Sequence, residues 1–352
     1  MKEGTVVAHY QHSVKRKVLI LVLLTAILLC SVLYSVSVGT VSIPLKELIG
    51  IVTQSGEGSM NAYIVYEIRL PRIVMAIITG MALASAGVIM QVLLRNPLAS
   101  PFTLGVSSGA SFGAALAIVL GTSVFGINLT AGNQWMIALN AFVFGCLSVF
   151  LVYGISRMKS GSTTVLLLAG VAIGQLFSAG VSALKYFSNN EALKDLVVWL
   201  MGGFWGSNWQ VIQFLVPLVF VSFLILLKFS WDLNALSSGE EVAKTLGVNV
   251  KRLRIAALFL VTLVASATIA FTGIIGFIGL VAPHIGRMII GVDNRYLLPC
   301  ACLMGAIILL LSDTFARTVL SPIEIPVGII TSAIGAPFFI WLLVQKRKDY
   351  WA

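Results

Sequence analysis

The sequence predicts an all-α protein that crosses a membrane about ten times. Hydrophobic residues make up 59% of the 352 residues, charged residues make up only 10%, and the mean hydropathy is +1.01. The apolar residues form stretches of about 20, the length that a helix needs to cross roughly 30 Å of hydrocarbon. The short alternating segments of a β-barrel are absent. Because a helix satisfies its backbone groups internally, we expect every span to be helical.

Ten apolar stretches are the candidate spans. They cover residues 18–38, 73–94, 102–121, 135–155, 162–184, 211–227, 255–272, 274–290, 296–312 and 325–344. The first follows a basic run at 15–17, lacks a clear cleavage site and is interpreted as a retained helix. Apolar stretch 255–283 is too long for one span, and its glycines predict a break near the middle. Segment 196–206 is short and predicts an external or re-entrant helix, so nine or eleven spans stay possible.

Basic residues predict the orientation. With both termini in the cytoplasm, 17 of the 23 Lys and Arg residues face inward, and the opposite topology would invert that ratio. The expected organisation is a cytoplasmic tail at 1–17, one permease domain at 18–346 with a cytoplasmic loop at 230–254, and a cytoplasmic tail at 347–352. The net charge of +10 therefore needs no nucleic-acid partner.

Small residues recur at the spacing that lets helices approach closely in lipid. These ridges are Gly105, Gly109 and Gly113; Gly80 with Ala84; and Gly170 with Gly174. We interpret them as helix-packing surfaces. A faint similarity between residues 69–87 and 252–268, which would run in opposite directions, suggests a possible inverted repeat.

The chain carries no recognisable catalytic machinery. It has no phosphate-binding loop of the GxxxxGK[ST] type, no HExxH and no nucleophile–base set. Its four cysteines lie in apolar stretches and favour buried packing over a disulfide or metal site. We therefore predict no enzyme activity and no cofactor.

Asp313 and Arg317 lie one turn apart and are interpreted as a helix-surface pair. An ion-coupled secondary transporter, which would need Asp313 as its coupling residue, is the alternative function.

One polar island, residues 237–254, interrupts the apolar sequence. Ser238 and Glu241 have capping-box spacing and predict a helix start, and Gly247 can end that helix. A basic cluster follows at 251–254. A solvated loop anchored at the lipid surface is one interpretation. A loop of this length with its own helix is more often functional, so we favour coupling to a cytoplasmic partner.

Eight motifs in order resemble the permease family of ABC importers for iron-siderophores, haem and cobalamin. They are IRLPR (68–72), NPLASPFTLGVSSGA (96–110), LLLAGVAIG (166–174), WLMGGFWG (199–206), GEEVAKTLGVNVKRLR (239–254), GFIGLVAPHIGRMIIGVDNRYLLP (276–299), SDTFAR (312–317) and EIPVGIITSAIGAPFFIWLL (324–343). The resemblance covers most of the chain. It departs modestly in the SPIEIP loop and at Asn294, where His is frequent in the family.

The resemblance implies a ten-span permease in the cell membrane that moves an iron chelate inward. Its implied partners are a cytoplasmic ATP-binding subunit, an extracytoplasmic substrate-binding protein and a second permease chain, the same or related. The implied ATPase-coupling helix contains Ser238, Glu240, Glu241, Lys244, Leu246 and Gly247. The implied cytoplasmic gate contains Asn96, Leu98, Ser162, Thr163 and Thr164. The implied docking residues for the binding protein are Arg69, Arg72 and Arg317.

Overall fold

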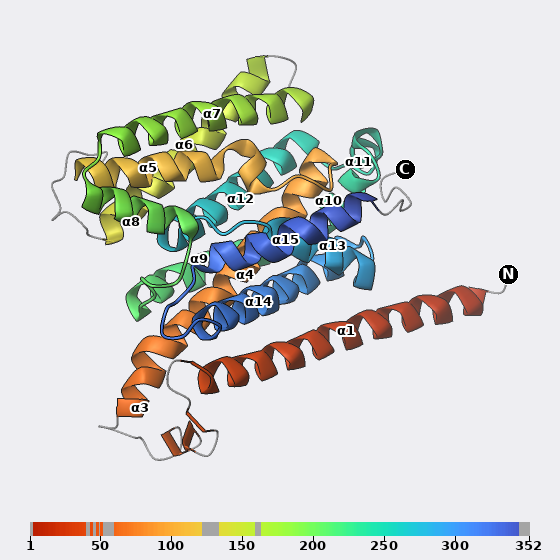
Figure 1. The fold of residues 1–352 in the computed structure, drawn as a ribbon. Coiled ribbons are helices and arrows are strands. Elements are labelled where there is room, and N and C mark those ends of the chain that lie inside the picture. Colours follow the sequence, from red (N-terminus) through yellow and green to blue (C-terminus); the bar gives the residue numbers. More distant parts are fainter. Residues whose placement is uncertain are drawn as a thin grey trace.

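The protein is a bundle of helices that run roughly along one long axis (Figure 1). The computed structural model describes residues 3–39, 43–44, 47–48, 50–51, 60–121, 134–158 and 163–344, and these contain helices and no strand. The membrane-spanning, all-α prediction is therefore confirmed for the described part of the chain.

The helices follow in simple order. They are α1 (Glu3–Ser37), α3 (Met60–Tyr63), the π-helix η1 (Ile64–Arg69), α4 (Leu70–Leu94), the 3₁₀-helix η2 (Pro101–Leu104), α5 (Val106–Leu120), α6 (Gln134–Met158), α7 (Thr163–Phe187), α8 (Asn190–Met201), α9 (Trp209–Lys228), α10 (Ser230–Ser237), α11 (Glu240–Thr245), α12 (Val250–Thr272), α13 (Ile278–Ile290), α14 (Asn294–Thr318) and α15 (Val327–Val344).

Each of the ten expected spans corresponds to a helix. Seven stretches of the described chain are long and apolar enough to cross a membrane, and α5, α13 and α15 are shorter apolar helices. The expected break lies between Thr272 and Ile278, where Phe277 adopts a left-handed backbone with φ of 67°. The short helix expected at 196–206 is α8, which begins six residues earlier, at Asn190.

Helix α4 is the centre of the bundle. Almost every side chain from Pro71 to Leu94 is buried, as expected for a helix that is apolar on all sides. It packs against α12, α13 and α14. At the crossing with α14, a Cβ on Gly80 would lie 2.3 Å from the carbonyl oxygen of Gly305, so only glycine allows this approach. The packing role predicted for Gly80 is confirmed.

A buried glutamine supplies a hydrogen bond that the backbone of α13 lacks. Pro283 lies inside this helix and has no N–H to donate to the carbonyl of Gly279, one turn earlier. Gln91 on α4 is fully buried, and its Nε2 donates to that carbonyl oxygen at 3.4 Å. The side chain thus replaces the missing backbone donor and links α4 to α13.

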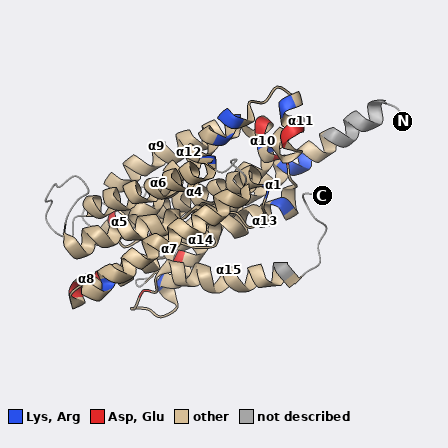
Figure 2. Ribbon diagram, turned by 90° about the horizontal axis from the view of Figure 1, so that it is seen from above, with Lys and Arg blue, Asp and Glu red and all other residues tan. Residues whose placement is uncertain are grey.

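The two ends of the bundle differ in charge (Figure 2). One end, here called the α11 end, carries α10, α11 and the first turns of α1, and basic residues gather there. The opposite end, the α8 end, carries α3 and α8. Helix α4 runs toward the α11 end and α12 runs away from it, which agrees with the opposite directions required by an inverted repeat. The repeat itself stays a prediction.

Candidate functional site

Helix α11 is the predicted coupling helix, and it lies at one extreme of the molecule (Figure 1). Its six residues, Glu240–Thr245, anchor through Ala243, whose side chain is fully buried. Val242 and Leu246 are instead 44% and 67% exposed. Exposed apolar side chains on a short helix at a polar end form a surface that another protein can cover.

The start of α11 corrects the sequence prediction. The N-cap residue is Gly239, with φ of 129°, and no side chain caps the helix. The Ser238 hydroxyl donates backward to the carbonyl of Asn234 at 3.4 Å, because α10 continues to Ser237 and occupies the preceding turn. The predicted capping box between Ser238 and Glu241 is therefore wrong.

The end of α11 confirms the prediction for Gly247. This residue has φ of +83°, its N–H donates to Lys244 at 3.0 Å, and the N–H of Val248 donates to Ala243 at 2.9 Å. These two bonds form a Schellman motif, which needs a left-handed residue at the position of Gly247.

The charges on α11 are paired but exposed. Lys244 Nζ lies 2.9 Å from Glu241 Oε1, and the hydrogen bond from this pair raises the pKa of Lys244. Glu240 receives a hydrogen bond from Arg254 on α12 at 3.0 Å, which joins the coupling helix to the next span. Pairs of this exposure contribute little to stability.

The predicted gate residues flank the same end. Asn96 Oδ1 accepts a hydrogen bond from the N–H of Leu98 at 2.9 Å, forming a local turn after α4, and Leu98 is 44% exposed. Thr163 and Thr164 begin α7. Ser162 lies outside the described residues. The role of these residues as a gate stays a prediction.

A junction around Asp293 joins three helices at the α11 end. Its carboxylate caps the first turn of α14, accepts hydrogen bonds from Arg295 and from Asn234 of α10, and lies 3.9 Å from Lys17 of α1. Burial alone would raise the pKa of Asp293, but the bonds from Arg295 and Asn234 lower it to about 2. Asn294, the residue that departs from the family pattern, is buried here and bonds to Asn234.

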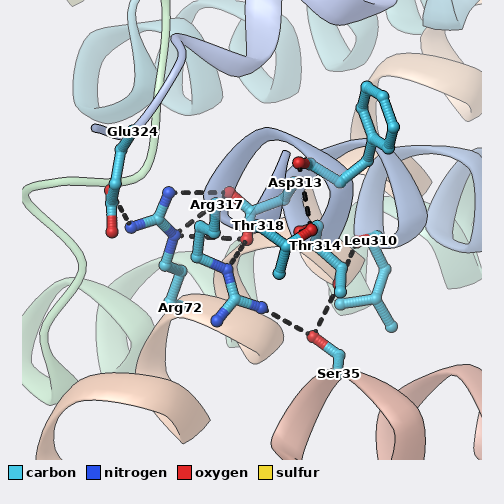
Figure 3. Close-up of polar contacts among 9 residues, drawn as sticks. Ser35, Arg72, Leu310, Asp313, Thr314, Arg317, Thr318 and Glu324 are labelled. Carbon is cyan, nitrogen blue, oxygen red and sulfur yellow. Dashed lines mark hydrogen bonds and ion pairs between the residues drawn. The ribbon is translucent and has the colours of Figure 1, made fainter. Parts of the chain in front are cut away.

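At the α8 end, three buried charged side chains and the partly exposed Glu324 form a group, here called the arginine cluster: Arg72, Asp313, Arg317 and Glu324 (Figure 3). Arg72 Nε donates to both Asp313 oxygens at 3.0 and 3.2 Å, and its Nη1 donates to Glu324 at 2.7 Å. Arg317 Nε donates to Asp313 at 3.1 Å. The cluster joins α4, α14 and the segment 319–326.

Ser35 extends the arginine cluster to α1. Its hydroxyl oxygen accepts hydrogen bonds from Arg317 at 2.9 Å and from Thr314 at 2.8 Å (Figure 3). Arg69 lies nearby and donates to the carbonyl of Val36. The first helix, although mostly peripheral, is thus fastened to the centre of the bundle by polar contacts.

These contacts revise the sequence interpretation. The pairing of Asp313 with Arg317 is confirmed, but its placement on a helix surface is wrong, since their exposed fractions are 0% and 5%. The three predicted docking arginines are all buried, and Arg72 and Arg317 already have anionic partners. Sequence reasoning missed Glu324 and the central position of Asp313. Charges within apolar segments normally pair with one another, which was the available signal.

A cavity of about 650 Å³ lies at the α8 end, between α5, α6, α8 and α12. Glu191 and Asp195 of α8 line it together with Trp199 and Trp205. Within the described residues, no group of three or more His, Cys, Asp or Glu side chains is arranged to hold a metal ion.

Known proteins resemble this chain over nearly its whole length. The FecCD transport family matches residues 27–345. The hemin transport system permease protein HmuU of Yersinia pestis is 39% identical over 331 residues, covering 94% of this chain and 97% of that protein. The Fe(3+)-citrate import system permease protein YfmE of Bacillus subtilis is 36% identical, covering 95% and 98%. A solved inward-facing structure of a metal-chelate type ABC transporter superposes with a TM-score of 0.81 at 37% identity, covering 92% and 98%.

Proposed function

This chain belongs to the FecCD transport family, and on that premise we propose that it is the permease subunit of an ATP-driven importer that carries an iron chelate. The observation that carries the proposal is α11, a short helix with exposed Leu246 and Val242 at the basic end of a membrane bundle. The chain contains no phosphate-binding loop, so the energy would have to enter through such a contact.

We propose that the α11 end and both termini lie in the cytoplasm. The gathering of Lys and Arg at that end supports this orientation, because cytoplasmic loops carry an excess of basic residues. The loop 230–254, with α10 and α11, is then the cytoplasmic segment available to a partner.

The partner at α11 would be a subunit that binds and hydrolyses ATP. Its closure would push on α11, and the pairing of Glu240 with Arg254 would pass that displacement to α12. Asn96, Leu98 and the first residues of α7 lie at the same end, where they would gate the pathway by a shift between two populated states.

A second permease chain would cover α7. The exposed side of this helix carries small residues, Ala172, Ala179 and Ala183, and polar Gln175 and Ser182, alongside large apolar residues such as Leu168 and Leu176. Small residues on a span favour close contact with another helix in lipid, and polar ones are poorly suited to face lipid. We place the substrate pathway between the two copies.

An extracytoplasmic binding protein would dock at the α8 end. Arg69, Arg72 and Arg317 stay our candidates for its contacts. Because these arginines are buried, carboxylates of a docking protein would have to compete for them with Asp313 and Glu324. Glu324 is the more accessible of the two acids, with a side chain 30% exposed.

The iron-chelate assignment rests on relatives. Those compared are named for hemin and for Fe(3+)-citrate, and the solved structure is of metal-chelate type. These cargos share a metal centre wrapped by an organic ligand, and we infer the same class here. Fluorescence quenching with such chelates in proteoliposomes carrying the full importer would identify the cargo.

Affinity purification of the chain from mild detergent, followed by mass spectrometry, tests the coupling proposal. We expect an ATP-binding subunit in one-to-one ratio with the permease. Leu246→Asp should abolish its capture while the amount of permease in the membrane stays unchanged, because a charge at the exposed tip of α11 cannot enter an apolar contact. Leu320→Asp makes the same change at a 58% exposed site at the α8 end and should have no effect.

Capture that survives Leu246→Asp, or loss that occurs equally in Leu320→Asp, would contradict coupling through α11. Uptake that stops with an uncoupler while ATP is maintained would favour an ion-coupled transporter instead. The engagement of Asp313 by two arginines speaks against that alternative, since a coupling acid needs to exchange its partner ion.

A further inference from the structure

A second cavity lies at the α11 end, beside the coupling helix and the predicted gate, and shares Glu240 and Thr163 with them. It has a volume of about 380 Å³ and opens between the C-terminal ends of α4 and α6, the N-terminal ends of α7 and α12, and α11. A cavity of this size can hold a small molecule or a lipid headgroup.

The charge of this cavity is strongly positive. Of the residues that the structure describes, Arg157, Lys251 and Arg254 line it together with one acid, Glu240. Glu240 is already bonded to Arg254 at 3.0 Å. Among the residues that the structure describes, no carboxylate forms an ion pair with Arg157 or Lys251. Two exposed cations from different helices therefore line one cavity with no ion-pair partner among the described residues.

The remaining lining has three polar and five apolar residues. Three residues with hydroxyl groups, Tyr153, Ser156 and Thr163, line the cavity, while leucines and Met90 from α4, α7 and α12 form the apolar part. Hydroxyls and guanidinium groups are donors that suit phosphate oxygens, and the apolar part suits a hydrocarbon chain.

We propose that this cavity binds a phosphate-bearing anion, either the headgroup of an anionic phospholipid or a soluble phosphate. Basic pockets between spans at the cytoplasmic side are where acidic headgroups are held. Arg157 and Lys251 would provide the charge, and Tyr153 and Ser156 would complete the hydrogen bonds. The argument for a headgroup rests on the proposed cytoplasmic placement of the α11 end, but not on the proposed transport function.

Its consequence for coupling does rest on the proposed function. The anion would attract Arg254 away from Glu240, and that ion pair links α12 to α11. Occupancy of the cavity would then change how firmly the coupling helix is held, so that the lipid or phosphate present tunes transport.

Direct binding tests the proposal on the full-length chain in neutral detergent. Phosphatidylglycerol is titrated and followed by native mass spectrometry, and inorganic phosphate is titrated separately by calorimetry. The double variant Arg157→Gln with Lys251→Gln should bind about 25-fold more weakly, since a surface cation near a headgroup contributes about a factor of five in affinity.

The matched control is Lys228→Gln with Arg252→Gln, which removes the same charge from exposed residues of the same end outside the cavity lining. It should bind like the wild type. Arg157→Lys with Lys251→Arg keeps both charges and should retain binding, which separates loss of the anion site from misfolding.

Loss of phosphatidylglycerol binding in the cavity variant alone supports the proposal and identifies lipid as the source. The same pattern with inorganic phosphate alone supports it with a soluble source. Equal affinity of the wild type and the cavity variant for both probes would overturn it, as would equal losses in the cavity variant and the matched control. Transport assays are not needed for any of these outcomes.

Discussion

The arginine cluster at the α8 end of this permease and helix α11 at the other end hold their charges in opposite ways. At the α8 end, Asp313 is fully buried and is bonded by Arg72 and Arg317, in a cluster that ties three parts of the chain together. At the α11 end, Glu241 has a side chain 86% exposed and, within the described part of the chain, forms its ion pair with Lys244, three residues along the same helix. Ion pairs between acidic and basic side chains thus connect helices in the arginine cluster, whereas on α11 they lie on an exposed surface.

Burial accounts for the difference. Removing one partner of a buried ion pair leaves the other charge buried and unpaired, which lowers the stability by several kcal/mol. An exposed ion pair, in contrast, contributes only about 0–1 kcal/mol. The arginine cluster, which ties helices together, therefore consists mostly of buried ions, and the Asp293 junction at the α11 end is an intermediate case with a side chain 19% exposed. The end proposed to move under a partner carries pairs that can open at little cost. Replacing acids of graded exposure by their amides tests this comparison.

Asp313→Asn should have the largest effect. It leaves Arg72 and Arg317 buried beside a neutral amide, and breaking a buried ion group in this way costs about 3–5 kcal/mol. Unfolding in mixed detergent micelles, followed by circular dichroism, measures the change in free energy. A loss below about 1 kcal/mol would show that the cluster does not hold the α8 end.

Asp293→Asn should have the second-largest effect on stability. The side chain is 19% exposed, and the amide still caps α14 but loses its ion pairs with Arg295 and Lys17, at about 1 kcal/mol near neutral pH. Because the folded pKa of Asp293 is lowered from 3.8 to about 2, its stabilisation is present above pH 3.8 and is lost as the pH falls toward 2. The difference between wild type and variant, measured from pH 7 down to pH 3, should shrink; a constant difference would contradict the charge-based account.

Glu324→Gln should act locally. The amide can no longer form the ion pair with Arg72 at 2.7 Å, but Arg72 keeps Asp313 and the rest of the cluster stays intact. We expect faster hydrogen exchange in segment 319–326 and a change in global stability of about 1 kcal/mol or less. The exchange of α4 serves as the internal control and should not change. Faster exchange throughout α4 and α14 would mean that Glu324 is part of the global junction.

The sequence predicts the helices better than it predicts these junctions. Apolar stretches of about 20 residues and the glycines near 273–279 are local signals, so the spans and the break after Thr272 follow directly from them. Gly247 was predictable because a Schellman motif is also local. The arginine cluster joins residues up to 252 positions apart, and periodicity carries no information about such pairs. The prediction of a capping box was wrong for a related reason. Ser238 is the C-cap residue of the preceding helix α10, and its hydroxyl bonds to Asn234 of that helix rather than to α11.

Glu241→Gln should have the smallest effect and gives the sharpest contrast with Asp313→Asn. The substitution removes an exposed ion pair from α11, while the helix stays anchored by buried Ala243 and by the Schellman motif at Gly247. Unfolding should therefore match the wild type within the error of the measurement, and capture of the ATP-binding subunit should persist because Leu246 is unchanged. If the global stability falls as it does in Asp313→Asn, then α11 is a structural element of the bundle rather than a surface held ready for a partner, and the distinction between the two ends fails.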